Sequence, residues 1–301
     1  MKRILVAGVT GYLGRFVARE LKSRGYFVRA LVRSPDKLDD LADELDDIVQ
    51  GDVTRADTLE GVCRDIDVVF SSVGITRQQG TLTWKGVDYQ GNLNLLNEAR
   101  RAGARKFVYV SSFDGPQLMH LDIIRAHEDF VAELAASGMD YTVLRPTGYF
   151  SDLAEIFTMA SKGRVYLFGD GESRINPIHG ADLAVCCADA VDDERRAIDV
   201  GGPEVLTWRE IAEGAFEAQR KPVRISTVPR WVMLVVIFVT RLFSRHKAGL
   251  VAFFTTMATR DVVAPPTGNH TLGRHYRTLA ADSEHGTDNT SKQRTSQGAA
   301  S

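Results

Sequence analysis

Short apolar runs alternate with amphipathic stretches through the first half of the chain. Residues 4–7 form a continuous apolar run, as expected for a parallel strand that is buried on both faces. Residues 13–21 then carry apolar side chains at helical spacing, and Gly25 stands where a left-handed residue would end a helix. Further strands are predicted at residues 26–32, 48–51, 67–71, 106–110 and 141–144. The pattern predicts an α/β fold with a doubly wound parallel sheet.

Beyond residue 150 this rhythm changes and predicts a smaller C-terminal substrate lobe. Residues 175–179 resemble an edge strand that returns to the sheet, and residues 207–210 form a capping box that would open a helix. The polar composition after residue 280 cannot bury enough surface to order itself. We therefore expect a core at residues 1–150, a substrate or lid lobe at 151–280 with elements that return to the core, and a disordered tail at 281–301.

One stretch of the lobe, residues 228–243, is strongly apolar. Its uninterrupted part, residues 231–239, is shorter than the about 20 residues needed to cross a bilayer, and arginines bracket it. Three interpretations stay open. The stretch could be a buried helix of the lobe, a lid over an apolar pocket, or a helix that makes a peripheral contact in a membrane interface.

Composition narrows the classes of function. The 301 residues carry a net charge of −2, so no basic excess points to a nucleic-acid partner. The three cysteines, Cys63, Cys186 and Cys187, lack the spacing of a metal site and are typical of buried reduced thiols. The sequence opens directly into the first predicted strand, so we expect no secretory signal. We expect a cytoplasmic protein without a metal, either free or peripheral at the inner face of a membrane.

Three glycines, Gly8, Gly11 and Gly14, separate the first predicted strand from the helix that follows it. Glycines let the backbone approach a diphosphate, and the N–H groups and dipole at a helix start attract its charge. The spacing is Gly-x-x-Gly-x-x-Gly, not the Gly-x-Gly-x-x-Gly of the usual dinucleotide fingerprint. A plain strand-to-helix turn is the alternative interpretation.

Arg33 stands just past the second predicted strand, with Lys37 close behind. An acidic residue here would bind the ribose 2′-hydroxyl of NADH, whereas an arginine accommodates the 2′-phosphate of NADPH. The sequence therefore favours NADPH, and a solvated loop charge is the alternative role for Arg33. Asp52, after the third strand, could accept from the adenine amino group or form an Asx-type turn.

Several motifs together resemble a short-chain dehydrogenase/reductase of the extended or atypical kind. They are the glycine turn, Arg33, the Ser111-Ser112 strand end and Arg145-Pro146-Thr147. More narrowly, residues 125–128, 145–150, 168–171, 177–184 and 201–203 are similar to the divinyl reductase family of the chlorophyll pathway and its relatives, including an accessory subunit of respiratory complex I. The resemblance covers most of residues 1–225 and implies a Rossmann fold that binds NADPH.

The chain departs from the short-chain dehydrogenases at one motif. Active short-chain dehydrogenases generally use a Tyr-x-x-x-Lys pair, and the corresponding segment here, residues 123–127, reads Ile-Ile-Arg-Ala-His. His127 could replace the lysine at the ribose or donate a proton, or a carboxylate such as Glu128 or Asp129 could simply satisfy it. Tyr149 could donate a proton or only wall the pocket, because nothing nearby would lower its pKa from about 10.

We therefore expect an NADPH-dependent oxidoreductase that transfers a hydride to a conjugated alkene or carbonyl of a bulky hydrophobic substrate. The alternative is a non-catalytic NADPH-binding redox sensor or assembly factor. The expected catalytic residues are His127 and Tyr149. The expected cofactor-binding residues are Gly8, Thr10, Gly11, Tyr12, Leu13, Gly14, Arg33, Lys37, Asp52, Val53, Ser71, Val73, Gly74, Ser111, Ser112, His127, Pro146 and Thr147.

Overall fold

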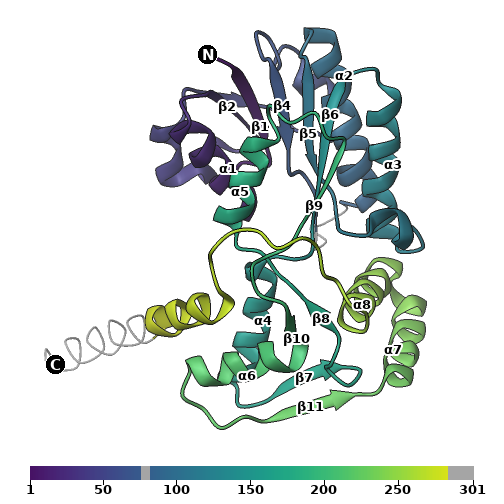
Figure 1. Ribbon diagram of the computed structural model, residues 1–301. Helices are drawn as coiled ribbons and strands as arrows, with labels where there is room; N and C mark the ends of the chain where they lie inside the picture. Colours follow the sequence, from purple (N-terminus) through teal and green to yellow (C-terminus); the bar gives the residue numbers. More distant parts are fainter. Residues whose placement is uncertain (76–81, 284–301) are drawn as a thin grey trace, which may run out of the picture.

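Seven parallel strands form the core sheet, and a smaller lobe lies beyond its carboxyl edge (Figure 1). The computed structural model describes residues 1–75 and 82–283. The strand order is β3-β2-β1-β4-β5-β6-β9, which confirms the predicted doubly wound, Rossmann-like fold. The strands are β1 (Arg3–Ala7), β2 (Phe27–Val32), β3 (Asp47–Gln50), β4 (Val68–Ser71), β5 (Lys106–Val110), β6 (Asp140–Pro146) and β9 (Ala197–Val200).

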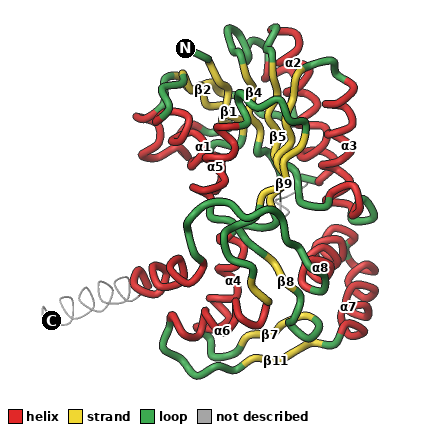
Figure 2. Tube along the Cα trace, in the orientation of Figure 1, coloured by secondary structure: helices red, strands yellow, loops and turns green. Residues whose placement is uncertain are grey.

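Helices cover both faces of this sheet (Figure 2). Successive side chains of a strand point to opposite faces, so Ile4 and Val6 pack in the same cluster as α1 and α5, whereas Leu5 and Ala7 pack with α2 and α3. Gly25 follows α1 with a φ of +78°, as predicted. The helices are α1 (Tyr12–Ser23), α2 (Asn92–Ala102), α3 (Asp122–Ala136) and α5 (Gly180–Asp189), and shorter turns are η1 (Pro35–Glu44), η2 (Ala56–Leu59), η3 (Lys85–Gly91) and η4 (Gly115–Leu118).

The lobe is packed around a second apolar cluster, which is built on α4 and α6 and also includes residues of η4 and α3. Two small sheets complete it, with β7 parallel to β11 and β8 antiparallel to β10. The predicted capping box is confirmed, since Thr207 and Glu210 each accept from the other's backbone N–H at the start of α6. The elements are α4 (Phe150–Ser161), β7 (Val165–Phe168), β8 (Arg174–Ile175), β10 (Leu206–Thr207), α6 (Trp208–Ala218), β11 (Ile225–Val228), α7 (Arg230–Phe243) and α8 (Arg245–Ala258).

Residues 175–179 were expected to return to the edge of the main sheet, and they do so only at one residue. Ile175 pairs with β10, and the amide of Asn176 donates to the carbonyl of Val262, so this part of the segment belongs to the lobe. Ile178 is buried in the core cluster of the main sheet and forms an isolated parallel bridge with Tyr149, just past β6. The edge position next to β6 is occupied by β9 instead.

The interpretation of residues 228–243 as a buried helix is wrong. The stretch forms α7, in which only Met233 is buried, and α8 packs beside it. Within residues 1–75 and 82–283, no helix combines the length and apolarity that a bilayer crossing requires. The expected tail at 281–301 begins inside a helix at residues 272–283, and its remainder, 284–301, lies outside the described residues.

Candidate cofactor site

A groove runs along the carboxyl ends of β1, β2 and β4, the edge at which doubly wound sheets bind ligands. Each of these strands contributes the residues that directly follow it. The lining residues are Ala7, Gly8, Thr10, Gly11, Leu31, Val32, Arg33, Gly51, Asp52, Val53, Thr54, Ser72, Val73, Gly74, Ile75, Leu82 and Val87.

The glycine turn at one end of the groove leaves no room for side chains. Gly8 has a φ of +87°, and a Cβ there would lie 2.8 Å from Oγ of Ser72. A Cβ on Gly14 would lie 2.1 Å from the carbonyl oxygen of Gly8. Gly11 is the N-cap of α1 and makes no side-chain capping bond. Bare backbone at a helix start fits a diphosphate, which its N–H groups and dipole attract.

The side chains next to these glycines hold the first turn of α1 in place. Leu13 is buried in the core, and the hydroxyl of Tyr12 accepts a hydrogen bond of 3.0 Å from the amide of Gly180 in α5. Burial raises the pKa of Tyr12. These two predicted cofactor residues therefore act on a ligand only through the backbone of their turn.

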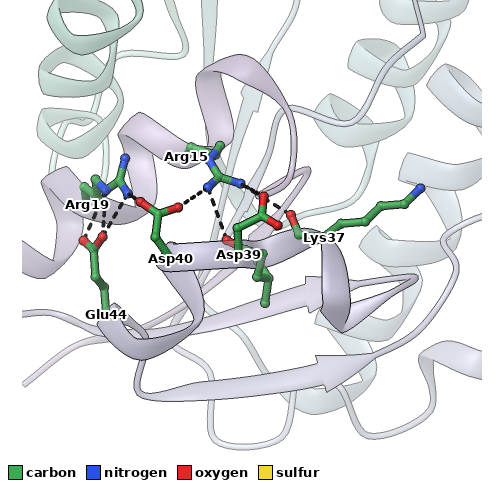
Figure 3. A network of polar contacts seen from close by, with 7 residues as sticks. Arg15, Arg19, Lys37, Asp39, Asp40 and Glu44 are labelled. Carbon is green, nitrogen blue, oxygen red and sulfur yellow. Dashed lines mark hydrogen bonds and ion pairs between the residues drawn. The ribbon is translucent and has the colours of Figure 1, made fainter. Parts of the chain in front are cut away.

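Arg33 lines the groove, and its exposed side chain makes no ion pair within residues 1–75 and 82–283. The following segment, η1, is tied to α1 by charge pairs shown in Figure 3, with Asp40 2.6 Å from both Arg15 and Arg19. Lys37 lies outside the lining, and its side chain points away from this network. A guanidinium without a carboxylate partner at the groove wall fits a phosphate oxygen.

Asp52 lines the groove and also forms the turn that was its alternative role. Its Oδ1 accepts from the amide of Thr54 at 2.9 Å and from the Thr54 hydroxyl at 2.8 Å. Val53 and Thr54 line the same wall. The Asx-type turn therefore shapes this end of the groove.

Ser72, and not the predicted Ser71, lines the groove after β4. Ser71 is fully buried and its hydroxyl donates to Oδ1 of Asn92 at 2.6 Å. Because side chains alternate along a strand, Ser72 points the other way and lines the groove. The side chain of Ser71 therefore lies outside the groove lining, whereas Val73 and Gly74, also predicted to bind the cofactor, line the groove.

His127 lies directly behind the groove wall, with both ring nitrogens engaged. Its Nε2 is 3.2 Å from Oδ1 of the buried Asp88, and its Nδ1 is 2.6 Å from the hydroxyl of Tyr109. A carboxylate requires a proton on Nε2, so in the neutral ring Nδ1 accepts from Tyr109. A Cβ on Gly74 would lie 3.4 Å from Cε1 of the ring. The expected carboxylate partner exists, but it is Asp88 and not Glu128 or Asp129.

The polar residues after β5 and β6 are used inside the protein. Oγ of Ser111 donates to Glu128 at 2.8 Å, and Arg145 donates to the other oxygen of that carboxylate at 2.7 Å. The Thr147 hydroxyl donates to the carbonyl of Asn176 at 2.5 Å. Four predicted cofactor residues lie outside the groove lining: Ser111, Ser112, Pro146 and Thr147.

Tyr149 also lies outside the lining. Its ring meets that of Tyr12 edge-on at 6.0 Å and packs against the core. Burial raises the pKa of its hydroxyl far above the usual value, with Asp152 adding to the effect. The structure favours the role of a wall, because so weak an acid is a poor proton donor near neutral pH.

Several groove residues escaped the sequence analysis. Ile75, Leu82 and Val87 form an apolar end of the lining, and Asp88 fixes His127 from behind it. Apolar side chains in a loop carry no signal that separates a ligand wall from packing. The i, i+4 pair Asp88 and Asn92, both buried polar residues of one helical stretch, was a usable signal.

Comparison with known proteins supports this assignment of the groove. Residues 8–194 match a family model described as NAD(P)H-binding. The fold is similar to an NADPH-dependent quinone oxidoreductase from Escherichia coli solved with NADPH, with a TM-score of 0.72, 20% identity, and 92% and 99% of the two chains covered. It is also similar to leucoanthocyanidin reductase from Vitis vinifera with NADPH, with a TM-score of 0.74, 17% identity, and coverage of 93% and 99%.

Two curated relatives differ in what they do. Divinyl chlorophyllide a 8-vinyl-reductase of Cucumis sativus is 34% identical over 76% of this chain and 60% of its own length, so the chain spans about three fifths of that relative. Photosystem II assembly factor Ycf39 of Synechocystis is 29% identical over 80% of this chain and 75% of its own. The predicted resemblance to the divinyl reductase branch is confirmed, and the likeness to a complex I subunit stays a prediction.

Proposed function

Because the chain belongs to the NAD(P)H-binding family of Rossmann-fold proteins, we propose that it is an NADPH-dependent reductase of a bulky hydrophobic substrate. The observation that carries the proposal is the groove itself, which joins a bare glycine turn and Arg33, which has no ion-pair partner in the described part of the chain, to the apolar residues Ile75, Leu82 and Val87. The first part suits a phosphorylated dinucleotide and the second suits an apolar ligand. The acceptor we propose is a conjugated alkene or carbonyl.

The residues have separate tasks in this proposal. The amides at the start of α1 and the guanidinium of Arg33 bind phosphates and set the position of the dinucleotide. When bound, NADPH supplies a hydride. His127, held by Asp88 and Tyr109, stands beside Gly74 in the place of the missing lysine and shapes the wall there, and water provides the proton. Tyr149 is a wall.

A second function is favoured by a specific observation, the engagement of both nitrogens of His127. A histidine whose polar atoms are all used by the fold has none left for catalysis, and Ycf39 is named as an assembly factor and not as an enzyme. The alternative proposal is therefore a protein that binds NADPH without turnover and acts as a redox sensor or assembly factor.

The test follows NADPH absorbance with a panel of quinones, enones and tetrapyrroles. We expect oxidation with at least one acceptor, a loss of about tenfold or more in His127→Ala, and near wild-type rates in Tyr149→Phe. His120→Ala, a change of the same kind at an exposed histidine, is the matched control. Tight NADPH binding without oxidation across the whole panel would reject the reductase and favour the sensor.

A further inference from the structure

Helix α7 exposes large apolar side chains over most of its length. At about 100° per residue, the exposed ones spread over roughly 200° of its circumference, much more than the stripe a helix needs to pack on a core. Trp231, Phe238 and Phe243 are 67%, 66% and 86% exposed. The exposed apolar residues of α7 are Trp231, Leu234, Val235, Val236, Phe238, Val239, Leu242 and Phe243. An apolar surface of this extent marks an interaction site.

All the charged residues in this part of the sequence are basic. Residues 218–260 contain eight Lys and Arg residues and no Asp or Glu, in a chain whose net charge is −2. Four of these basic residues, Arg230, Arg241, Arg245 and Lys247, belong to the helical pair α7 and α8. Four exposed basic side chains on this helical pair complement an anionic partner.

The combination of apolar and basic groups selects the partner. The fourteen residues of α7 span about 21 Å, short of the about 30 Å of a bilayer core, so the helix cannot cross one. Pairing of two copies through this face would bring like charges together, which is unfavourable. Apolar side chains with basic flanks are the chemistry of a helix that lies in the headgroup region.

We propose that α7 and α8 together seat the protein on the surface of an anionic lipid bilayer. The side chains Trp231, Leu234, Phe238 and Leu242 enter the acyl boundary, and the four basic residues contact the headgroups. Figure 1 shows α7 at the outer edge of the lobe, where a flat surface can reach it. This seating does not depend on the proposed reductase activity.

The seated helices adjoin the apolar end of the groove. Trp84 stacks on His246 of α8 at 4.0 Å, and a Cβ on Gly249 would lie 2.9 Å from the Trp84 ring. The indole Nε1 of Trp84 donates to the carbonyl of Ile75 at 3.0 Å, and Ile75 lines the groove. Trp84 therefore links the seated helix α8 to the apolar end of the groove.

The experiment sediments the full chain with vesicles of phosphatidylcholine alone and with vesicles that also contain phosphatidylglycerol. We expect capture by the anionic vesicles, a blue shift of tryptophan fluorescence, and release at high salt. The variant Trp231→Ser/Phe238→Ser/Leu242→Ser should partition about 100-fold more weakly, because the buried apolar area is lost. Arg230→Gln/Arg241→Gln/Arg245→Gln/Lys247→Gln should lose the preference for phosphatidylglycerol.

The matched control is Tyr166→Ser/Val185→Ser/Val205→Ser, which removes exposed apolar groups elsewhere and should bind vesicles like the wild type. NADPH binding, measured on each variant, reports the fold, since neither triple variant touches the groove. Equal sedimentation of the wild type and the α7 variant would overturn the proposal. Failure of the wild type to bind anionic vesicles would overturn it too. In that case, loss of a dimer or of a protein partner in the α7 variant would assign the apolar face to that partner instead.

Discussion

The two ends of the groove are built from different parts of the chain. At the glycine turn the backbone forms the site, and Arg33 stands beside it without an ion-pair partner within residues 1–75 and 82–283. The other end is lined by apolar side chains, and outside the lining the polar side chains bind one another, as in the pairs of Asp88 with His127 and of Glu128 with Arg145. The first end therefore has free capacity for a ligand, whereas the polar groups of the second are engaged by the fold.

This contrast separates the residues that could bind the dinucleotide from those that stabilise the fold. A polar group that already has its partners inside the protein contributes to the free energy of unfolding, so a substitution of that group should lower stability. The bare turn makes few such contacts, so a change there should lower the affinity for the dinucleotide, and it should lower stability as well where it displaces the backbone. Each prediction below changes a residue in one of these two regions and states the expected effect on stability or on affinity.

The largest loss of stability is expected from Glu128→Ala. Glu128 and Arg145 have side chains that are 6% and 14% exposed, so the change leaves a guanidinium with little access to water and no carboxylate. Breaking a buried pair on one side costs about 3–5 kcal/mol, which urea unfolding would measure. Glu133→Ala, on the exposed side of the same helix, should change stability by less than about 0.5 kcal/mol. An unchanged stability with weakened NADPH binding would place Glu128 at the cofactor and remove the contrast.

At the opposite end, Gly14→Ala should destroy NADPH binding. The added Cβ would lie 2.1 Å from the carbonyl oxygen of Gly8, and this oxygen belongs to the backbone, so it cannot move aside without displacing the turn. Displacing the turn should cost about 3 kcal/mol of stability and reduce affinity about 100-fold or more by fluorescence titration. Gly214→Ala in α6 is the control, because no atom lies within 4 Å of its Cβ position, and we expect a gain of about 0.5–1 kcal/mol there. Normal affinity in Gly14→Ala would show that the dinucleotide lies elsewhere.

The same distinction explains what could be predicted from the sequence. The strands, the glycine turn, the φ of Gly25 and the capping box at Thr207 depend on residues close together in the chain, so local patterns found them. The partner of His127 is 39 positions away and reaches it only when η3 packs on α3. The exposure of α7 depends on which elements cover it, and periodicity says only that the helix is apolar.

A smaller effect is expected from Arg33→Asp, and it concerns affinity alone. Loss of a charge-assisted hydrogen bond to the 2′-phosphate should weaken NADPH binding by about 1–3 kcal/mol, with little change for NADH, which lacks that phosphate. Arg105→Asp changes the net charge equally at the start of β5, the edge of the sheet far from the groove, and should alter neither affinity. If the wild type binds both dinucleotides equally, Arg33 is only a solvated charge.

The smallest expected effect is a loss of stability at acidic pH, and it concerns only the glycine end of the groove. His179 caps α5, since its Nδ1 accepts from the amide of Ala181 at 3.2 Å, and the next residue, Gly180, donates to Tyr12 in the glycine turn. Burial lowers the pKa of His179 to about 4, with the neighbouring His270 and His275 adding to the effect and Asp182 opposing it.

The sign follows from the lowered pKa. Between pH 6.5 and 4 the unfolded chain binds a proton at His179 that the folded protein does not, so this stabilisation is complete above about pH 6.5 and is lost as the pH falls. His179 is only half-buried, and solvent screening should limit the loss to about 1 kcal/mol. His179→Asn keeps a capping acceptor that does not titrate, so the difference in unfolding free energy between the two proteins should vary with pH in this window alone. A difference that stays constant from pH 7 to 4 would mean that His179 titrates as in the unfolded chain.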